Sequence, residues 1–504
     1  MKILFNRYFL LFLIIILGAF LRIYNLSNDP AGFFCDEAAI GYNAYTILNT
    51  GKDEYGTPLP IFFKSFGDYK DPIDIYSTIP FIALFGLNEF AVRITSVLYG
   101  IITIILFYFL GQIIYSSRFG LICGLVAATM PWMVHYNRIG FELNTYLMFT
   151  TLTILLLLMS AKKNIYIPFF FLCLGLTFYT YQPAKLIVPL CLIAVLIIYR
   201  QLFLNNFNKT IIGLMIFIAI SNPLIISFLG SAGLARFSQV SIFSSHLSLN
   251  KIILLSIHNY LIQFKPSYYF TVGEPTIITR HFTHGLTPLL LSTAPFLFLG
   301  LIVLLNSLDK RVFQFVLFFI FIYPLGGALV AQAPFTSRDI IGVIPAVLLI
   351  SLGVYHACIY LNMHFKKISY IFYVIVFSAF MLNLYSFIYF YFAVYPLYSS
   401  NFWGWQFGAK GIINYFSRHE KQYDQLVMSP EFNAPEIFIK FYAPHDCNNC
   451  FIGTPNTLYN PKTKQLFALT PSYLASHPQY RFQDIKNIIY PNKTIAFEIG
   501  KIVQ

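Results

Sequence analysis

The chain has 504 residues, of which 58% are hydrophobic and only 11% are charged, and its formal net charge is +13. A soluble globular protein carries roughly 25% charged residues, so charges this sparse exclude an ordinary soluble enzyme and indicate that most of the chain faces lipid or other apolar helices. The basic residues lie mainly in short loops between apolar segments, and no basic stripe interleaved with aromatic residues stands out, which argues against nucleic-acid binding.

The first apolar run, Tyr8–Leu26, is long enough to cross the roughly 30 Å hydrocarbon core of a bilayer. A cleaved signal peptide has a shorter apolar core and a small-residue cleavage site, so we interpret this run as a permanent helix that begins in the cytoplasm. With ten further apolar runs, the sequence predicts a mainly α polytopic protein of about eleven transmembrane helices. The further runs lie at about 91–115, 119–135, 143–160, 165–182, 185–199, 210–229, 288–305, 312–331, 339–361 and 368–395.

Alternating the sides of these helices gathers basic residues at one set of helix ends, joined by short connections. This face carries Lys2, Arg7, Arg118, Lys162, Lys163, Arg200, Lys209, Lys310, Arg311, Lys366 and Lys367. The positive-inside rule makes it the cytoplasmic face, and an odd number of spans then places the C-terminus outside. The runs at about 119–135 and 185–199 are short, so a re-entrant or tilted course stays open for both.

The opposite face carries three long segments, at about 27–90, 230–287 and 396–504. Segments this long are usually functional or fold as small domains. The last one gains polar residues and contains two runs typical of short strands, Gln425–Met428 and Ile495–Phe497. We therefore expect a transmembrane domain over residues 1–395, with an outer catalytic loop at about 27–90, and a small soluble extracytoplasmic α/β domain over 396–504.

The cysteines are scattered, and only two of them form a motif. Cys447 and Cys450 make a C-x-x-C in the polar tail, close to His445. A local disulfide, two free thiols and half of a zinc site are all compatible with this spacing.

An acidic pair, Asp36 and Glu37, stands just beyond the first apolar run in the first outer loop. Asp36 could cap the N-terminus of a helix that follows it, because Asp is favoured there and suits the helix dipole. From Glu37 to Asn49, apolar and aromatic residues recur at helical spacing, which predicts a short amphipathic helix at the membrane interface.

The same loop continues as Asp68-Tyr69-Lys70-Asp71-Pro72. A lysine beside two aspartates near the membrane surface could bind an anionic head group, or the three could be an ordinary solvated charge cluster. Pro72 ends any helix before it and prepares the start of the next.

A third cluster lies on the outer side, where two apolar runs meet. Arg138 and Glu142 are four residues apart and would share one face of a helix, as a structural ion pair or as part of a site, because ionisable residues at membrane depth are costly and usually functional. Arg236 and Arg338 are lesser candidates, and Arg338 could simply pair with Asp339. His281 and His284 have a spacing that could bind metal, although no third ligand is in view.

These motifs, taken in order, resemble the bacterial branch of glycosyltransferase family 39, which is related to the protein O-mannosyltransferases and to the aminoarabinose transferases that modify lipid A. The resemblance is carried by the acidic pair, by Gly51–Gly56, Phe66–Lys70 with Pro72, Phe90–Arg93 and Arg138–Glu142, and more thinly by Arg236–Val240 and Arg338. It implies the multi-helix GT-C fold and transfer of a sugar, with inversion, from a polyprenyl phosphate on the outer face of the plasma (inner) membrane. The acceptor would be a protein, a lipid or a glycan.

The resemblance also implies roles for single residues. It places the catalytic carboxylate in the acidic pair, Asp36 with Glu37, and a phosphate-binding lysine at Lys70, although the family's Lys-Pro-Pro reads Lys70-Asp71-Pro72 here. In the aminoarabinose transferases a glutamate before that lysine helps to bind a metal. This chain has Tyr69 there, so the metal is not carried over, and a divalent ion is left open as a cofactor.

The chemistry of a single displacement agrees with these residue types, because it needs a base for the acceptor proton and cations for the departing phosphate. We assign Asp36 as the base, Lys70, Arg138 and Arg338 to the carrier phosphate, and Glu142, Tyr69 and Asp68 to substrate orientation, with Glu37 as second carboxylate of the catalytic pair.

A transporter or flippase of lipid-linked glycans is the alternative. It predicts charged or helix-breaking residues near the middle of the spans, whereas here they gather at the outer boundary. If Asp36, Lys70 and Arg138 line one outer cavity, the enzyme is favoured, and a channel at the midplane would favour transport.

Overall fold

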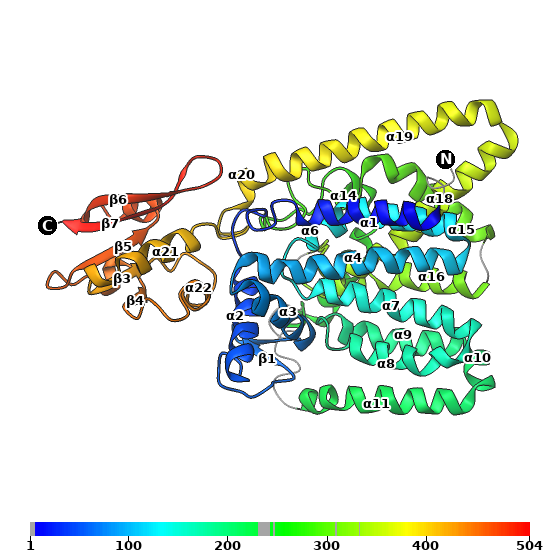
Figure 1. Ribbon diagram of the computed structural model, residues 1–504, viewed down its shortest axis with the longest axis horizontal. Coiled ribbons are helices and arrows are strands. Elements are labelled where there is room, and N and C mark those ends of the chain that lie inside the picture. The colour runs from blue at the N-terminus through cyan, green and yellow to red at the C-terminus, as the bar shows by residue number, and fades with distance from the viewer. Residues whose placement is uncertain (1–5, 230–241, 245–246, 308–309, 332, 504) are drawn as a thin grey trace.

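The computed structural model describes residues 6–229, 242–244, 247–307, 310–331 and 333–503, and most of the chain forms a bundle of helices (Figure 1). Each of the eleven predicted spans contains a helix of this bundle. These helices are α1 (Arg7–Ile23), α4 (Glu89–Ile114), α5 (Ser117–Thr129), α7 (Leu143–Lys162), α8 (Ile167–Thr177), α9 (Ala184–Ile198), α11 (Phe207–Leu229), α15 (Ala294–Ser307), α16 (Lys310–Ile322), α18 (Val343–His364) and α19 (Lys366–Tyr389).

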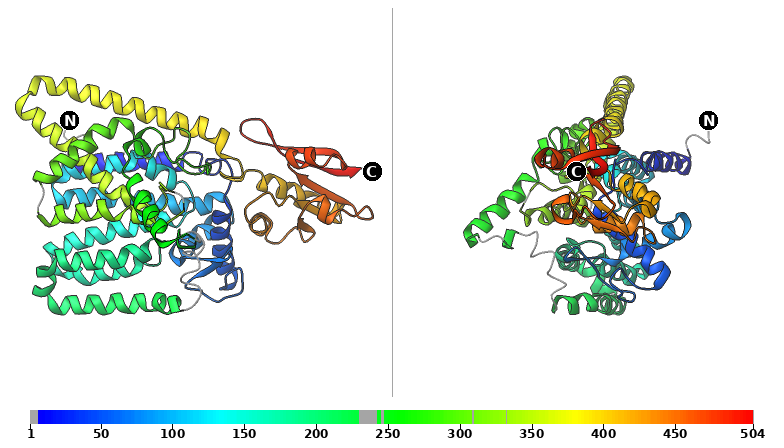
Figure 2. Two further views of the ribbon diagram at one scale, coloured as in Figure 1. Left: turned by 180° about the vertical axis from the view of Figure 1, so that it is seen from behind. Right: turned by 90° about the vertical axis from the view of Figure 1, so that its left-hand side faces the viewer.

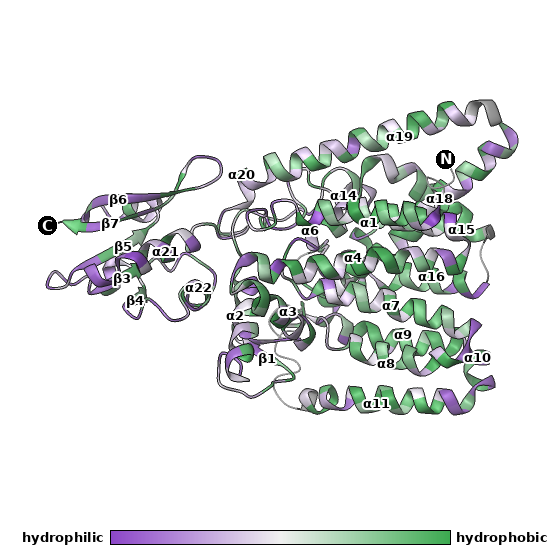
Figure 3. Ribbon diagram, viewed as in Figure 1, coloured by the Kyte–Doolittle hydropathy of each residue, from purple (hydrophilic) through white to green (hydrophobic). Residues whose placement is uncertain are grey.

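Six helical stretches of the described chain are long and apolar enough to cross a membrane: Glu89–Ile114, Leu143–Lys162, Phe207–Ser227, Lys310–Ala328, Ile340–His364 and Ser369–Ser399. Apolar residues cover the bundle helices over most of their length (Figure 3). The predicted runs at 119–135 and 185–199 are indeed short helices: the first breaks between α5 and α6 (Pro131–Tyr136), where Pro131 begins a new helix. The remaining short helices of this part are α10 (Arg200–Asn205), α13 (Leu249–Ile262), α14 (Pro266–Phe270) and α17 (Leu325–Ala328).

The first outer loop folds at one end of the bundle. It forms α2 (Cys35–Thr50), a hairpin of β1 (Phe63–Ser65) and β2 (Asp68–Lys70), and α3 (Pro72–Phe85), which begins at the predicted proline. The hairpin turns at Phe66 and Gly67, whose φ angles of 51° and 79° are the left-handed values that a two-residue hairpin turn requires. This turn pairs Lys70 with Phe63 and so fixes the position of Lys70 at the end of β2.

The chain after α20 (Tyr395–Ser399) forms a mixed sheet beyond that same end of the bundle (Figure 2). The strand order is β4-β3-β5-β7-β6, with β4, β3 and β5 parallel and β5, β7 and β6 antiparallel. The elements are α21 (Ala409–His419), β3 (Gln425–Met428), α22 (Glu436–Tyr442), β4 (Cys450–Ile452), α23 (Pro455–Leu458), β5 (Gln465–Leu469), α24 (Pro471–Ser476), β6 (Arg481–Ile489) and β7 (Ile495–Val503). Both strand-like runs are therefore strands.

Helix α22 joins this sheet domain to α2. The Phe441 ring lies 4.9 Å from the ring of Phe33, and Tyr45 Oη lies 2.6 Å from His445 Nε2. Of the three alternatives for the C-x-x-C, the structure has the local disulfide, between Cys447 and Cys450. The sheet domain thus rests on the helix that carries the acidic pair.

Candidate active site

Asp36 and Lys70 meet in a cavity at the end of the bundle. Asp36 lies in the first turn of α2, and Lys70 is the last residue of β2; Lys70 Nζ lies 2.9 Å from Asp36 Oδ1. The cap position of α2 belongs to Phe34, so Asp36 is not the N-cap that the sequence allowed. With side-chain exposures of 13% for Lys70 and 33% for Asp36, both groups stay reachable from solvent. Asp68, Tyr69, Glu142 and Arg338 line the same cavity.

Glu142 enters the cavity from the start of α7. Its Oε1 accepts a hydrogen bond of 2.9 Å from the backbone N–H of Asp71, which ties α7 to the residue after β2. Burial raises the pKa of Glu142 from 4.5 to about 8, although the nearby Lys70 opposes the shift. Glu142 is therefore mostly protonated at neutral pH, and a protonated carboxyl can donate a hydrogen bond to a substrate.

Asp71 is the residue at which this chain departs from Lys-Pro-Pro. It is buried, and its carboxylate pairs with Lys185 and not with the neighbouring Lys70. Its Oδ1 lies 3.2 Å from Lys185 Nζ in α9, and that lysine also donates to Gln182 Oε1 at 2.7 Å. Gln182 in turn donates to the backbone carbonyl of Tyr69 at 3.0 Å. The extra negative charge beside Lys70 is thus offset by Lys185, and the same contacts hold β2 in place.

Two arginines from later loops complete the cavity wall. Arg338 lies 5.7 Å above the ring of Tyr181, while Asp339 accepts a hydrogen bond of 2.8 Å from Gly327 N instead of forming the ion pair that the sequence allowed. Arg280 lies 4.1 Å above the ring of Phe34 and donates to the carbonyl of Trp403 at 3.1 Å. Arg280 is not among the predicted site residues, and its one signal in the sequence is a basic residue beside His281 in an outer loop.

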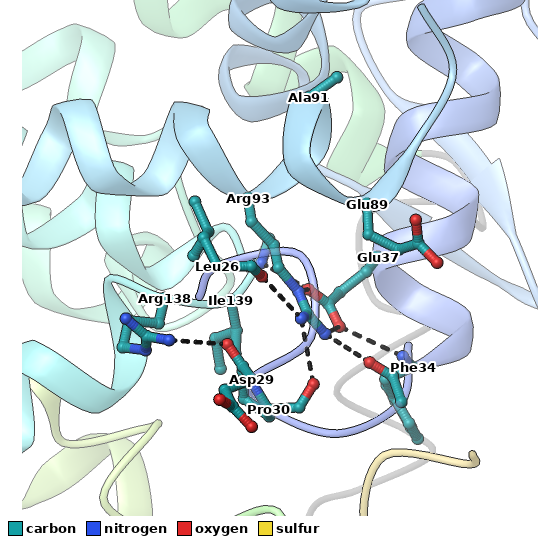
Figure 4. Close-up of polar contacts among 12 residues, drawn as sticks. Leu26, Asp29, Pro30, Phe34, Glu37, Glu89, Ala91, Arg93, Arg138 and Ile139 are labelled. Atoms are coloured by element: carbon teal, nitrogen blue, oxygen red, sulfur yellow. Dashed lines mark hydrogen bonds and ion pairs between the residues drawn. The ribbon is translucent and has the colours of Figure 1, made fainter. Parts of the chain in front are cut away.

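Glu37 is committed to the protein interior. Arg93 binds it through two hydrogen bonds, from Nε at 2.9 Å and from Nη2 at 3.2 Å, and both side chains are fully buried (Figure 4). Glu37 also accepts from the backbone N–H groups of Gly140 at 3.0 Å and Phe34 at 3.2 Å.

Arg93 gives its remaining donors to the loop between α1 and α2. They reach the carbonyls of Leu26 at 3.1 Å, Pro30 at 3.1 Å and Gly32 at 2.6 Å. A carboxylate so enclosed has no access to an acceptor hydroxyl, so the geometry makes Glu37 a residue that positions the Asp36 turn.

Arg138 does not reach the cavity to which the sequence analysis assigned it. Its guanidinium is fully buried and donates to four backbone carbonyls. They belong to Leu21 at 3.0 Å, Arg22 at 3.1 Å, Tyr24 at 2.8 Å and Asp29 at 2.9 Å. These carbonyls include acceptors at the C-terminal end of α1 that have no partner within the helix, and Arg138 satisfies them. Glu142 faces the cavity instead, so the two residues do not form the ion pair that the sequence left open.

The two histidines of the metal hypothesis are separated. His281 Nδ1 lies 3.1 Å from Tyr136 Oη, whereas His284 packs edge-on against Tyr398 with ring centroids 5.1 Å apart. Within the described ranges, no group of three or more His, Cys, Asp and Glu side chains could hold a metal ion. Arg236 lies outside the described residues.

Sequence and fold comparisons agree with this architecture. Residues 74–226 match the family model described as dolichyl-phosphate-mannose-protein mannosyltransferase, which confirms the resemblance to glycosyltransferase family 39. The match contains Arg93, Arg138 and Glu142 and begins after Asp36 and Lys70. No curated protein matches the chain at a significant level.

Two solved structures share the fold at low sequence identity. ArnT from Cupriavidus metallidurans, bound to undecaprenyl phosphate, is 11% identical with a TM-score of 0.52, and the match covers 97% of each chain. The oligosaccharyltransferase AglB from Archaeoglobus fulgidus, in complex with an inhibitory peptide and a dolichol-phosphate, is 13% identical with a TM-score of 0.52 and matches over 87% of this chain and 63% of its own. The fold is therefore the predicted GT-C fold of a multi-pass membrane protein.

Proposed function

We propose that this protein is a membrane glycosyltransferase that moves a sugar from a polyprenyl-phosphate carrier to an acceptor on the outer face of the plasma (inner) membrane, with inversion. One observation carries the proposal: a single cavity holds the Asp36 carboxylate together with three cations, Lys70, Arg280 and Arg338. The structures that share the fold support it, because one holds undecaprenyl phosphate and the other a dolichol-phosphate.

The reaction is a single displacement at the anomeric carbon. Asp36 takes the proton of the acceptor hydroxyl, the new glycosidic bond forms as the bond to the carrier phosphate breaks, and the configuration inverts. Lys70, Arg280 and Arg338 stabilise the negative charge that returns to the phosphate. Protonated Glu142, with Asp68 and Tyr69, orients the sugar hydroxyls in the cavity.

The charge pattern supports the orientation. The cavity lies at the end of the bundle that is opposite the basic helix ends, which the positive-inside rule assigns to the cytoplasm. The N-terminus would then be cytoplasmic, and the cavity and the sheet domain extracytoplasmic. The charged side chains of the cavity lie at the outer end of the bundle and not near the middle of the spans, which also favours transfer over transport.

The experiment is a transfer assay in proteoliposomes. The protein is reconstituted and supplied with labelled sugar on a polyprenyl phosphate, and donor consumption, the anomeric configuration of the product and movement of donor across the bilayer are recorded together. Donor consumption with inversion is the expected result. If a panel of donors is moved across the bilayer and none is consumed, the transporter alternative is correct.

Arg280→Met should raise the KM for the lipid-linked donor by roughly 10- to 100-fold, because a hydrogen bond to a charged group contributes about 1.5–3 kcal/mol. The exposed Arg481→Met on β6 is the matched control and should leave KM unchanged. An unchanged KM for Arg280→Met with a lowered Tm would mean that Arg280 only ties Trp403 to the cavity wall.

Glu142→Gln should change how stability depends on pH. Because the pKa of Glu142 is raised from 4.5 to about 8, the folded protein keeps a proton that the unfolded chain releases between these values. The free energy of unfolding therefore falls as the pH rises through this window, and Gln, which does not ionise, removes that part of the fall.

The Tm of purified protein at pH 5 and at pH 8.5 measures this effect. The variant should gain Tm relative to wild type at pH 8.5 and little at pH 5, while the exposed Glu436→Gln should show no such difference. An equal Tm difference at both pH values would contradict the raised pKa.

A further inference from the structure

A second cavity, of about 650 Å³, lies where the bundle meets the sheet domain. Its walls come from the loop after α1, from the π-helical turn Phe390–Val394 that follows α19 together with α20, and from the start of α21 (Figures 1 and 2). Its volume falls within the roughly 300–1,000 Å³ of small-molecule sites. The proposed transfer does not use this cavity.

The polar part of its wall holds four carboxamides, Asn25, Asn28, Gln406 and Asn414, beside Ser27, Asp29, Glu89, Lys410 and Tyr442. Each carboxamide offers donors and an acceptor, as each hydroxyl group of a ligand does, so the two kinds of group are complementary. Amides carry no charge, so they do not favour a phosphate over a neutral group.

The charged side chains of this wall already have polar partners, and its one cation, Lys410, is held by a carboxylate. Lys410 Nζ lies 3.0 Å from Glu89 Oε2, and Asn25 donates to the carboxylate of Asp29. The cavity of Asp36, by contrast, gathers Lys70, Arg280 and Arg338. The second cavity is therefore suited to a neutral ligand.

Gln406 is the most unusual residue of this wall. It is 3% exposed, and neither its Oε1 nor its Nε2 has a hydrogen-bond partner among the residues that the structure describes. Its φ of 53° is a left-handed value that is uncommon outside glycine. Buried amides without partners are rare in folded proteins, because desolvation of the group costs free energy that no contact offsets. Neither amide atom has surface open to the cavity in this conformation, so a rotation of the side chain would let a bound ligand exchange hydrogen bonds with it and remove that cost.

Aromatic rings supply the apolar part of the wall, with Phe33, Phe392 and Phe407. The C–H face of a sugar ring can pack on such rings while its hydroxyls meet the amides. The two cavities are close along the chain. Phe33 lines the second cavity, the ring of the next residue, Phe34, lies under Arg280, and Asp36 of the first cavity follows two residues later.

We propose that this junction cavity binds neutral sugar residues of a glycan acceptor, next to the cavity in which transfer takes place. The naming of the ligand as acceptor rests on the proposed function, whereas the binding of a neutral saccharide does not. The sheet domain would then serve recognition, because α21 supplies Asn414 and the segment before it supplies Gln406.

The test is saturation-transfer NMR on the full-length protein in a zwitterionic detergent that contains no sugar. The probes are the methyl glycosides of glucose, mannose and galactose, with glucose 1-phosphate as the charged counterpart. At least one methyl glycoside should bind, and glucose 1-phosphate, which the three cations of the first cavity can hold, should not displace it. Gln406→Met and Asn414→Ala should each weaken its binding by roughly tenfold, and the exposed Gln479→Leu should not.

Two further measurements show whether a variant loses binding because it is less stable, and whether the glycoside binds in the first cavity instead. Gln406→Met should not lower the Tm, because it removes a buried amide that lacks a partner; Asn414, which is exposed, tests the cavity without any risk to folding. Asp36→Asn and added polyprenyl phosphate should leave glycoside binding unchanged.

Three results would overturn the inference: that no methyl glycoside binds, that binding survives both wall variants, or that polyprenyl phosphate displaces the sugar. Because no donor sugar is present, saccharide binding in a protein that fails the transfer assay would contradict the proposed transferase and leave the binding site standing.

Discussion

Replacing Asp36 with asparagine should reduce the rate of sugar transfer by roughly 100- to 10,000-fold, the range that a positioned general base contributes. Asparagine keeps the size of the side chain and an oxygen that can accept from Lys70, now 2.9 Å from the carboxylate, but it cannot take a proton from the acceptor. The measurement is transfer of labelled sugar from a polyprenyl-phosphate donor in proteoliposomes. Because Asp36 is partly exposed, the Tm of the variant protein and its binding of the carrier should stay near those of wild type.

Asp484→Asn, on exposed β6, is the matched control and should retain full activity. If Asp36→Asn is fully active, the base must be another carboxylate, and the same cavity offers Asp68 and Glu142. If it is inactive but also fails to bind the carrier, the loss would report on the Asp36–Lys70 pair instead of on proton transfer.

Arg93→Met should destabilise the protein by about 3–5 kcal/mol, the cost of breaking a buried ion pair and leaving one charge without its partner. The variant removes both hydrogen bonds to Glu37 and those to three loop carbonyls, in a site where both side chains are fully buried. The expected result is a large fall in Tm and in the yield of folded protein in detergent. A Tm close to that of wild type would contradict the structural role of the pair.

Glu37→Gln tests the same pair from its other side and also tests the catalytic role that the sequence suggested for Glu37. Loss of folded protein is expected, since the amide leaves Arg93 charged and buried. A folded variant with normal Tm and a large loss of kcat would instead favour a catalytic Glu37. Lys440→Met is the comparison at a half-exposed pair: Lys440 is 41% exposed, and Glu54, which is 3% exposed, keeps a hydrogen bond from Asn43, so the fall in Tm should be smaller than for Arg93→Met.

The hydrophobic pattern predicted the helices well, because a membrane-spanning helix needs a certain length and apolar composition, and both can be read from one continuous segment of the sequence. All eleven predicted spans contain helices, and the two short runs at 119–135 and 185–199 are short in the structure. The strand at Gln425–Met428 could also be predicted, but the pairing of β3 with both β4 and β5 could not, because pairing joins segments that are distant in the chain.

The structure brings most, but not all, of the predicted site residues together. Asp36, Lys70, Asp68, Tyr69, Glu142 and Arg338, all predicted, line one cavity. Glu37 and Arg138 are instead enclosed in hydrogen bonds, and Arg280 takes a place in the cavity that the sequence did not indicate. All three are charged residues of outer segments, so composition and spacing do not distinguish a residue that binds substrate from one that holds a loop.

The sequence by itself determined that the chain is a membrane-embedded helical bundle with a polar tail, and that its acidic and basic motifs gather outside the apolar runs, because burial of apolar length is a local property. Only the tertiary structure decided which charges meet. The end of α1 packs on the segment before α7 and draws Arg138 to four backbone carbonyls. The β1–β2 turn brings Lys70 to Asp36, and Lys185 from α9 takes up the charge of Asp71. Buried polar groups must find partners wherever the fold offers them, and those partners are distant in sequence.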